Sequence, residues 1–337
     1  MRQTANNRIS DFVQIERGER HTRDPEAEHA EVRGNLLRTL PRIDSKYFYD
    51  DDGSRLFEEI TQIPEYYQTR TEEALLESIA DEVVRLTGAR EMVELGSGAG
   101  RKIRLLLDAM RRQGQLENCV LLDINETFLR SSAEELADQY PEMEVRGVVG
   151  DFLHDLDLIG SGNNRLFIFL AGTIGNLYPR QFATFLKSVR GILGEGDSFL
   201  IGLDLVKDTA RLEAAYNDSA GVTAEFNLNA LRVVNQRFST DFEVEAFEHL
   251  AFYDPEQEWI EMRVRARRPT SVSLGDNREL RFDIGDEIRT EISRKFTRGS
   301  FVDALGGTGL ELSTWFTDPE HLFASALVRP VFENGSS

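Results

Sequence analysis

This chain is poor in cysteine, in positive charge and in long apolar runs, and each shortage excludes something. The single cysteine, Cys119, excludes an intrachain disulfide and a cysteine-based metal cluster. The five histidines show no metal-ligand spacing, so we expect no metal cofactor. Acidic residues outnumber basic ones by 59 to 39, and the formal net charge of −20 disfavours nucleic acids and anionic membrane surfaces as partners.

The sequence also lacks a membrane-targeting signal. No run of about 18 apolar residues occurs, and the first residues are polar and charged, without the apolar core of a signal peptide. Residues 1–17 show little periodicity and are expected to form a flexible arm. We therefore expect a cytoplasmic protein that acts as a monomer on a small molecule.

What the sequence does have is a glycine-rich turn between a short apolar run and a helical pattern. The run Met92–Leu95 is followed by glycines at positions 96, 98 and 100, and apolar residues recur at helical spacing over Arg101–Met110. Glycines allow a sharp turn close to a ligand, and the N-terminus of the next helix favours an electron-rich group. The turn taken alone is also compatible with an ordinary loop.

Acidic residues at the ends of predicted strands favour a cofactor site over a loop. Asp123 ends the run Val120–Asp123, and an acid at this place in a doubly wound sheet binds ribose hydroxyls. Asp151 and Phe152 end another apolar run, and they suit the amino group and the ring face of an adenine. A dinucleotide site would require a glycine at position 101, where this chain has Arg101. The glycine spacing resembles instead the first motif of S-adenosylmethionine-dependent methyltransferases.

Alternating strands and helices predict an α/β fold with a mostly parallel, doubly wound sheet. We expect strands near 92–95, 119–123, 145–149, 166–170 and 198–204, with helices between them. The pattern then changes to helices over 209–237 and alternating strands over 240–295. A final helix and two strands over 300–330 complete the sheet.

This order fits a sheet that is interrupted by an insert and completed by the C-terminal segment. The resemblance to S-adenosylmethionine-dependent methyltransferases implies that the sheet is a Rossmann-like class I methyltransferase domain and that the insert is an α+β substrate-binding domain. We expect the cofactor-binding domain over 71–206 and 297–330, and the substrate-binding domain over 18–70 and 207–296. Ser54 is expected to cap a helix that runs to position 61. The arginines at 263, 265, 267 and 268 are typical of the solvent face of a strand.

Motifs from about residue 45 to 330 are similar to those of the histidine-specific Nα-methyltransferases of ergothioneine biosynthesis. They are Tyr47–Asp50, Gly53–Ser54, Leu56–Glu58, Ile63–Tyr67 with Thr69–Arg70, Glu94–Gly98, Gly150–Phe152, Thr173–Leu177, Asp204–Asp208, Ala220–Asn227 and Glu291–Phe296. The resemblance implies a two-domain enzyme that methylates the α-amine of L-histidine up to three times, giving hercynine. It implies S-adenosylmethionine as the methyl donor, S-adenosylhomocysteine as the product, and no metal.

The same resemblance implies a role for individual residues. The cofactor would be held by Gly96, Lys102, Asp123, Asp151 and Phe152. The amino acid would be held by Tyr66, Asn176, Tyr216, Glu291, Ile292 and Ser293, of which Glu291 and Ser293 read the imidazole. The pocket would be lined by Tyr49, Phe57, Thr223 and Met262.

The chemistry expected of these residues is mainly positioning. Methyl transfer from a sulfonium is an in-line displacement, and correct orientation of the two reactants contributes up to about 7–11 kcal/mol. The α-amine must first lose a proton, and no histidine is an obvious base. We expect a tyrosine hydroxyl, such as that of Tyr49, and Asn176 to orient the neutral amine while water takes the proton. Ala171 stands where the family favours glycine, and its methyl narrows the space for repeated methylation.

Other functions are compatible with parts of the sequence. An enzyme with the same fold and cofactor could methylate another amino acid or a small amine. A nicotinamide dehydrogenase would explain the glycine turn and Asp123, but not the motifs at 150–152 and 291–296. A binding module without activity would not require both sets of motifs to be intact.

Overall fold

The computed structural model describes residues 13–17, 25–98, 100–274 and 278–332. The described residues form two compact units. Unit 1 contains 13–17, 68–206 and 296–332, and unit 2 contains 25–67 and 207–295. Unit 1 thus resumes at Gln68 and Phe296, where the sequence led us to expect positions 71 and 297.

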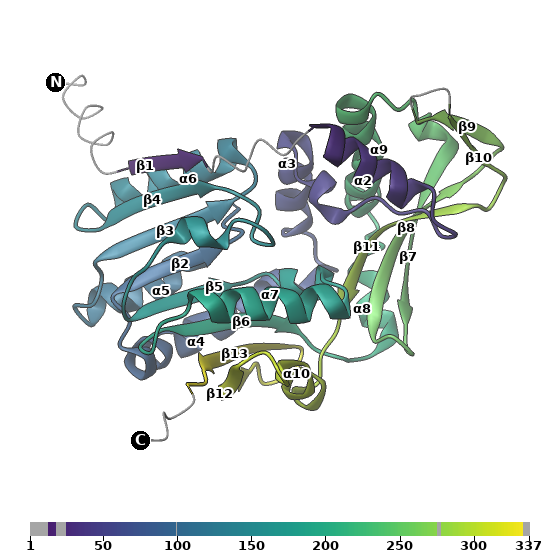
Figure 1. Cartoon of the computed structure of the whole chain (residues 1–337). Helices are drawn as coiled ribbons and strands as arrows, with labels where there is room; N and C mark the ends of the chain where they lie inside the picture. The colour runs from purple at the N-terminus through teal and green to yellow at the C-terminus, as the bar shows by residue number, and fades with distance from the viewer. Residues whose placement is uncertain (1–12, 18–24, 99, 275–277, 333–337) are drawn as a thin grey trace. The chain divides into compact units, whose positions relative to one another are not determined.

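Unit 1 is built on a sheet whose strand order is β1-β4-β3-β2-β5-β6-β13-β12 (Figure 1). Its strands are β1 (Val13–Arg17), β2 (Glu91–Leu95), β3 (Asn118–Asp123), β4 (Glu144–Val149), β5 (Arg165–Phe169), β6 (Ser198–Asp204), β12 (Leu310–Thr317) and β13 (Phe323–Pro330). β1 to β6 are parallel, and β13 is antiparallel to both of its neighbours. The central strands are almost wholly buried, as expected of parallel strands that are covered on both faces.

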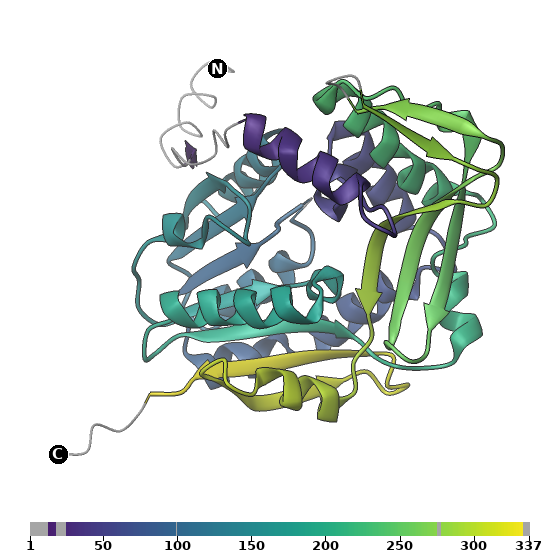
Figure 2. The same cartoon turned by 45° about the vertical axis from the view of Figure 1, so that its right-hand side comes forward.

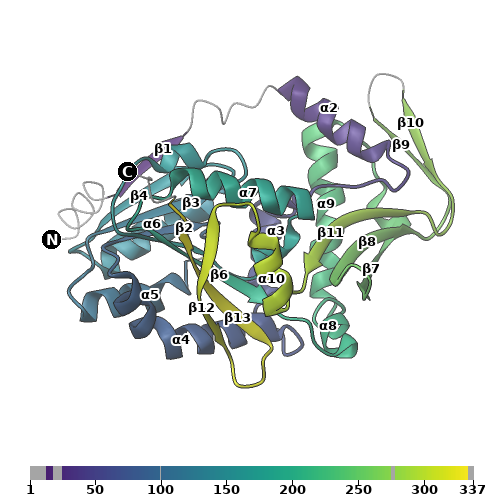
Figure 3. The same ribbon diagram turned by 60° about the horizontal axis from the view of Figure 1, so that its bottom comes forward.

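Helices cover both faces of this sheet. One face packs against α4 (Tyr67–Thr87), α5 (Ile103–Arg112) and α6 (Glu126–Gln139), and the other against α7 (Pro179–Ile192) and α10 (Arg298–Leu305) (Figure 3). The spacing of the buried residues explains the helices, since α5 buries Ile103, Leu106, Leu107 and Met110 along one stripe. The predicted doubly wound α/β sheet is confirmed.

β1 corrects the prediction of a flexible arm over 1–17. Val13–Arg17 forms an edge strand parallel to β4, and Val13 and Ile15 pack against the core. Gly147 on β4 makes room for this strand, because a Cβ there would lie 2.5 Å from Ile15 Cδ1. Five residues with only two inward apolar side chains give too weak a periodic signal to be recognised. Residues 1–12 lie outside the described part of the chain.

Unit 2 combines helices with small antiparallel sheets (Figure 2). Its helices are α2 (Pro25–Leu36), α3 (Asp51–Ile60), α8 (Thr209–Ala214) and α9 (Val222–Phe238). Its main sheet has the order β11-β8-β7, from β7 (Phe247–Asp254), β8 (Trp259–Ala266) and β11 (Glu287–Arg294), and β9 (Thr270–Ser273) pairs with β10 (Glu279–Phe282). α9 packs on α3 and on β7 and β8. The predicted α+β insertion after β6 is confirmed.

The start of α3 corrects the prediction that Ser54 is a helix cap. Asp50 is the N-cap, because its Oδ1 accepts a hydrogen bond of 2.8 Å from the Gly53 N–H. Asp51 and Asp52 then occupy the first turn, where negative charge is favoured by the helix dipole. The acidic turn therefore starts the helix instead of preceding it.

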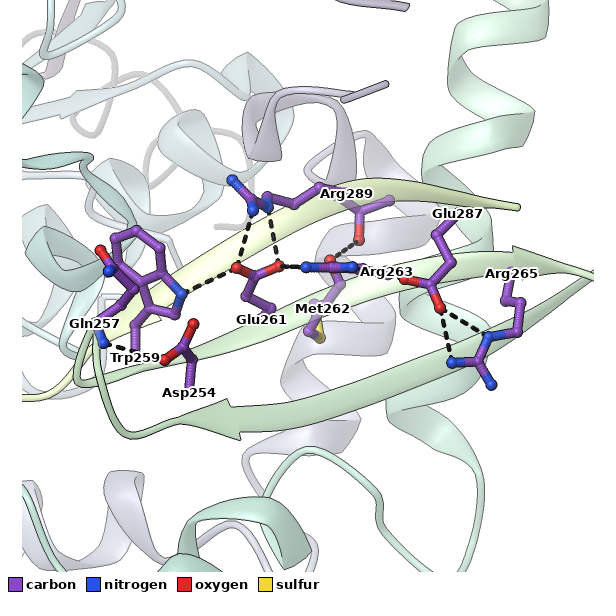
Figure 4. A network of polar contacts seen from close by, with 10 residues as sticks. Asp254, Gln257, Trp259, Glu261, Met262, Arg263, Arg265, Glu287 and Arg289 are labelled. Carbon is purple, nitrogen blue, oxygen red and sulfur yellow. Dashed lines mark hydrogen bonds and ion pairs between the residues drawn. The ribbon is translucent and has the colours of Figure 1, made fainter. Parts of the chain in front are cut away.

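One face of the β11-β8-β7 sheet carries a network of ion pairs (Figure 4). The buried Glu261 carboxylate accepts hydrogen bonds from Arg263, from Arg289 (2.9 and 3.0 Å) and from Trp259 Nε1 (3.1 Å). Arg263 also bonds Glu287, at 2.6 Å. The prediction that Arg263 lies on a solvent face is wrong, since its side chain is 19% exposed. The alternation of arginines in the sequence does not reveal that Glu261 and Glu287 lie on the same face of the sheet and pair with Arg263.

Within the described residues, no helix has both the length and the apolar character needed to cross a bilayer.

Candidate active site

The glycine turn after β2 adopts backbone conformations that favour glycine. Gly96, Gly98 and Gly100 have φ values of +71°, +47° and +60°. Among the described residues, a Cβ at Gly98 would meet nothing within 4 Å, and one at Gly96 would meet only Phe169, at 3.9 Å. β2 lies between β3 and β5, so the strands that follow β2 in the chain are added first on one side of it and then on the other. Open α/β sheets bind ligands at such a reversal of strand order.

Asp123, at the end of β3, is fixed by this turn. Its Oδ2 accepts from Gly98 N–H and its Oδ1 from Asn125 N–H, both at 2.8 Å. Burial raises the pKa of Asp123, while these backbone donors act in the opposite direction. The Ile124 N–H is a third backbone donor to this carboxylate. Two oxygens with two acceptor positions each still leave room for a further donor.

The segment after β4 brings an acid and an aromatic ring to the same edge of the sheet. Asp151 Oδ1 accepts from Leu153 N–H at 2.9 Å. The Phe152 ring contacts Phe169 and Phe185 edge-on, with centroid distances of 4.9 and 5.7 Å. The Phe152 ring is thus held at the carboxyl ends of the strands, close to β5.

Two buried polar atoms beside the glycine turn have no hydrogen-bond partner among the described residues. They are Glu94 Oε2 and Ser97 Oγ. Burial raises the pKa of Glu94 well above its usual value, and the neighbouring charge of Asp123 raises it further. A buried polar atom without a partner is costly, so this edge of the sheet suits a polar ligand that supplies the missing bonds.

Lys102 belongs to a buried network that the sequence did not reveal. Its Nζ pairs with Glu72 on α4, whose side chain is fully buried. The Glu72 carboxylate also accepts two hydrogen bonds from Ala171 N–H, at 3.0 and 2.8 Å. Gly202 on β6 is needed here, since a Cβ would lie 2.1 Å from Glu72 Oε1. The sequence does contain one signal for this network. Glu72 lies three residues before Leu75, on the apolar stripe of α4, where a charged residue is unexpected.

Asn176 follows β5 through a short strained segment. Ala171 and Gly172 are both left-handed, with φ values of +61° and +66°. A 3₁₀ turn, Thr173–Asn176, comes next, and Asn176 is partly exposed at its end. Ala171 therefore has the backbone conformation that explains why glycine would be favoured at this position.

In unit 2, four aromatic residues that the sequence assigned to the substrate form a continuous row of ring contacts. Tyr49 contacts Phe57 at 5.9 Å, Phe57 contacts Tyr66 at 6.3 Å, and Tyr66 contacts Tyr216 at 6.4 Å between centroids. These edge-on contacts join segments that are up to 167 positions apart in the chain (216 minus 49). The row therefore exists only in the folded unit.

A bulge in β11 determines which face Glu291 occupies. Arg289 pairs with Arg263 and Glu291 with Met262, so Thr290 is an extra residue on β11. Without it, strict alternation would place Glu291 on the ion-pair face with Arg289. The bulge moves Glu291 and Ser293 to the face of Met262 and Ile260, opposite Glu261. The Ile292 side chain, paired with Glu261, points to the other face, so the structure does not bring it together with them.

The bulge is held by a chain of buried hydrogen bonds. Thr290 Oγ1 lies 2.6 Å from Asn227 Oδ1 and 3.0 Å from the Met262 carbonyl oxygen. Asn227 Nδ2 donates to His249 Nδ1 at 2.7 Å, so Nε2 carries the His249 proton and donates to the Tyr216 carbonyl oxygen at 2.8 Å. Burial lowers the pKa of His249 and keeps the ring neutral. The backbone of Tyr216 is thereby tied to the bulge.

The side chain of Tyr216 returns to the same strand. Its hydroxyl donates to Ser293 Oγ at 2.8 Å, and Lys295 Nζ donates to both oxygens, at 3.0 and 2.9 Å. Burial raises the pKa of Glu291 to about 8, and the nearby Lys295 charge opposes this shift. Lys295 was not predicted, because a lysine in a strand pattern reads as exposed.

Thr223, at the start of α9, is a buried polar residue in unit 2. Its N–H donates to Asp218 Oδ1 at 2.8 Å. Met262 is buried on the face that carries Glu291. Unit 2 thus combines apolar walls with a few fixed polar groups, which is typical of a small-molecule site.

The predicted residues fall into two sets. Gly96, Lys102, Asp123, Asp151, Phe152 and Asn176 all lie in unit 1, in segments that follow β2 to β5. Tyr49, Tyr66, Tyr216, Glu291 and Ser293 lie in unit 2. Among the described residues, no cluster of His, Cys, Asp or Glu side chains is arranged to hold a metal ion.

The chain matches a family model described as "Histidine-specific methyltransferase, SAM-dependent" over residues 28–330. It is 44% identical over 303 residues to a "Histidine N-alpha-methyltransferase" of Mycolicibacterium smegmatis, which covers 90% of this chain and 94% of that protein. A Mycobacterium tuberculosis protein of the same name is 42% identical, covering 88% and 93%. "Ergothioneine biosynthesis protein 1" of Neurospora crassa is 32% identical, covering 86% of this chain and 33% of that protein.

Proposed function

Because this chain belongs to the family of histidine-specific, S-adenosylmethionine-dependent methyltransferases, we propose that it methylates the α-amino group of L-histidine. Up to three methyl groups are added, and the product is hercynine, for ergothioneine biosynthesis. The observation that carries this proposal is the bulge in β11, because it turns Glu291 and Ser293 to one face beside Tyr216. An acceptor and a donor on one face match the two nitrogens of an imidazole.

We propose that unit 1, with its class I methyltransferase sheet, holds the cofactor through Gly96, Lys102, Asp123, Asp151 and Phe152. S-adenosylmethionine, when bound, supplies an electrophilic methyl group on a sulfonium. The polar atoms without partners at Glu94 and Ser97 support a polar ligand here. Asp123 keeps acceptor capacity that suits a ribose hydroxyl, and the open space beside the glycines among the described residues allows close approach to the backbone.

The amino acid is held by Tyr66, Asn176, Tyr216, Ser293 and Glu291, and the Ile292 segment contributes through its main chain. Glu291 accepts the ring N–H, and a site built to bind that donor strongly rejects side chains without it. The rings of Tyr49, Phe57 and Tyr66 form an apolar wall, and Thr223 and Met262 complete the lining.

Catalysis in this proposal depends on orientation of the amine. Tyr49 and Asn176 orient the neutral amine so that its lone pair faces the methyl carbon, and water accepts the proton that the ammonium loses. Proximity of this kind supplies up to about 7–11 kcal/mol. The reaction needs no metal in this proposal, since a sulfonium that gives up its methyl group leaves as a neutral thioether, which is a good leaving group. We further propose that the protein works in the cytoplasm as a monomer.

The test is mass spectrometry of the products after incubation with S-adenosylmethionine and a panel of free amino acids. Histidine that gains three methyl groups, with the other amino acids unchanged, is the expected result. Histidine that stops at one or two groups would contradict trimethylation and implicate the methyl group of Ala171. Methylation of a different amino acid or amine in preference to histidine would overturn the substrate and leave the cofactor assignment standing.

A further inference from the structure

Lys295 is a buried lysine at the end of β11, next to the residues assigned to the imidazole. It is 2% exposed, and its Nζ lies 3.0 Å from Tyr216 Oη and 2.9 Å from Ser293 Oγ. Its Nζ is also 4.8 Å from the centre of the Tyr216 ring. Tyr216 in turn donates to Ser293 at 2.8 Å. These residues form a closed triangle of hydrogen bonds within unit 2.

The triangle fixes the direction of the Ser293 hydroxyl. A serine oxygen has two acceptor positions and one hydrogen. Both acceptor positions of Ser293 are used, one by Lys295 and one by Tyr216. Ser293 can therefore offer a ligand only its hydrogen. An ammonium group has three donors and no acceptor, so Lys295 cannot take that hydrogen back.

We propose that Lys295 is a positioning residue that makes Ser293 a hydrogen-bond donor, so that the site selects a neutral imidazole ring. The unprotonated ring nitrogen accepts from Ser293, and the ring N–H on the other nitrogen donates to Glu291. This rests on the proposed function, since it assumes that histidine is the substrate. The geometry excludes an imidazolium, which has no acceptor nitrogen, and disfavours rings without nitrogen.

Lys295 also influences the protonation state of Glu291. Its charge lowers the pKa of Glu291 against the effect of burial, and so favours the carboxylate, which is the better acceptor. One buried ammonium thus acts on both ends of the ring-binding site, because it directs the Ser293 hydrogen toward the ligand and opposes the protonation of Glu291.

The test compares four proteins, namely the wild type, Lys295→Met, Ser293→Ala and the double variant. Steady-state kinetics use L-histidine and 2-thienylalanine, whose five-membered ring has no nitrogen. For Lys295→Met we expect about a 10-fold or greater rise in KM for histidine and little change in kcat, because a charge-assisted hydrogen-bond arrangement is lost. We expect the preference for histidine over thienylalanine to fall by a similar factor.

The double variant separates positioning from simple support of the fold. If Lys295 acts through Ser293, the double variant has the same KM for histidine as Ser293→Ala alone. Losses that multiply, or a Lys295→Met variant with unchanged ring preference, would overturn the proposal. The affinity for S-adenosylhomocysteine, measured by calorimetry, and the melting temperature serve as controls. Neither value should follow the change in preference between histidine and thienylalanine.

Lys295→Gln provides a second variant in case Lys295→Met does not fold. Its amide can both donate to Ser293 and accept from it, so the serine hydrogen is no longer forced toward the ligand. An intermediate KM for histidine supports the proposal, and a wild-type KM overturns it. Absence of histidine turnover by the wild type would instead refute the proposed function itself.

Discussion

The two units hold their polar groups in different ways. Unit 1 relies on backbone geometry, because the turn at Gly96–Gly100 uses left-handed residues and main-chain N–H groups to fix Asp123. Unit 2 relies on side chains that bond one another, from Thr290 through Asn227 and His249 to Tyr216. The arrangement in unit 1 can be recognised in the sequence from the spacing of the glycines. The arrangement in unit 2 depends on which residues come into contact after folding, so the sequence alone does not reveal it.

Glu72 is an exception to this comparison, and its replacement gives the largest expected effect. In unit 1, the side chain of Glu72 holds two other polar groups in place. Glu72→Ala therefore leaves Lys102 and the Ala171 N–H without their buried partner. We expect a loss of about 3–5 kcal/mol in the free energy of unfolding, measured by urea titration. Glu77→Ala, on an exposed position of the same helix, is the matched control and should change stability by less than about 0.5 kcal/mol. Equal effects would show that Glu72 has no special role.

The next effect concerns selectivity in unit 2. Glu291→Ala removes the acceptor for the ring N–H, so the histidine kcat/KM should fall by about 100-fold or more relative to thienylalanine. Competition assays with both amino acids, read by mass spectrometry, measure this ratio directly. Glu287→Ala on the same strand is a control, because Glu287 lies in the ion-pair network with Arg263 and Arg265. Unchanged selectivity in Glu291→Ala would remove Glu291 from the site.

A smaller effect should follow from loosening the bulge. Thr290→Val keeps the shape but leaves the Asn227 carbonyl group and the Met262 carbonyl group without this donor. We expect about 1–3 kcal/mol of destabilisation and a higher KM for histidine, with S-adenosylhomocysteine affinity unchanged. Thermal melting measures the stability, steady-state kinetics measure the KM for histidine, and calorimetry measures the affinity for S-adenosylhomocysteine. Weaker S-adenosylhomocysteine binding would mean that unit 2 side chains also organise unit 1.

The smallest effect tests backbone geometry in unit 1. Ala171 has a φ of +61°, which costs an alanine about 1–2 kcal/mol. Ala171→Gly should therefore raise stability by up to about 1 kcal/mol, since glycine also has more entropy to lose on folding. Chemical unfolding checks the sign, and product analysis checks whether the share of trimethylated histidine rises. Destabilisation would show that the alanine methyl makes contacts that outweigh the strain.

The sequence predicted unit 1 well because parallel buried strands are nearly continuous apolar runs. The expected strand at 119–123 is β3 (Asn118–Asp123), and the expected strand at 198–204 is β6. The polar residues at the ends of these strands were recognisable for the same reason, since a carboxylate or a glycine turn stands out after an apolar run.

The parts that escaped prediction share a different cause. Glu72, Lys295 and Arg263 are charged residues that fold into buried or half-buried places, where partners distant in sequence satisfy them. A charge by itself reads as exposed. The bulge at Thr290 escaped because register depends on the neighbouring strand, which a single run of residues does not reveal.

The position of β13 has a consequence for protein synthesis. β13 lies between β6 and β12, yet Phe323 comes 119 positions after Asp204 in the chain (323 minus 204). At about 5–20 residues per second, the ribosome needs roughly 6–24 s to make that stretch. Throughout this time the backbone groups of β6 that pair with β13 are without their partners. Every segment of unit 2, by contrast, has been made once the ribosome has passed Lys295. The nascent chain can therefore complete its second unit before its first, and a chaperone has several seconds in which to cover β6.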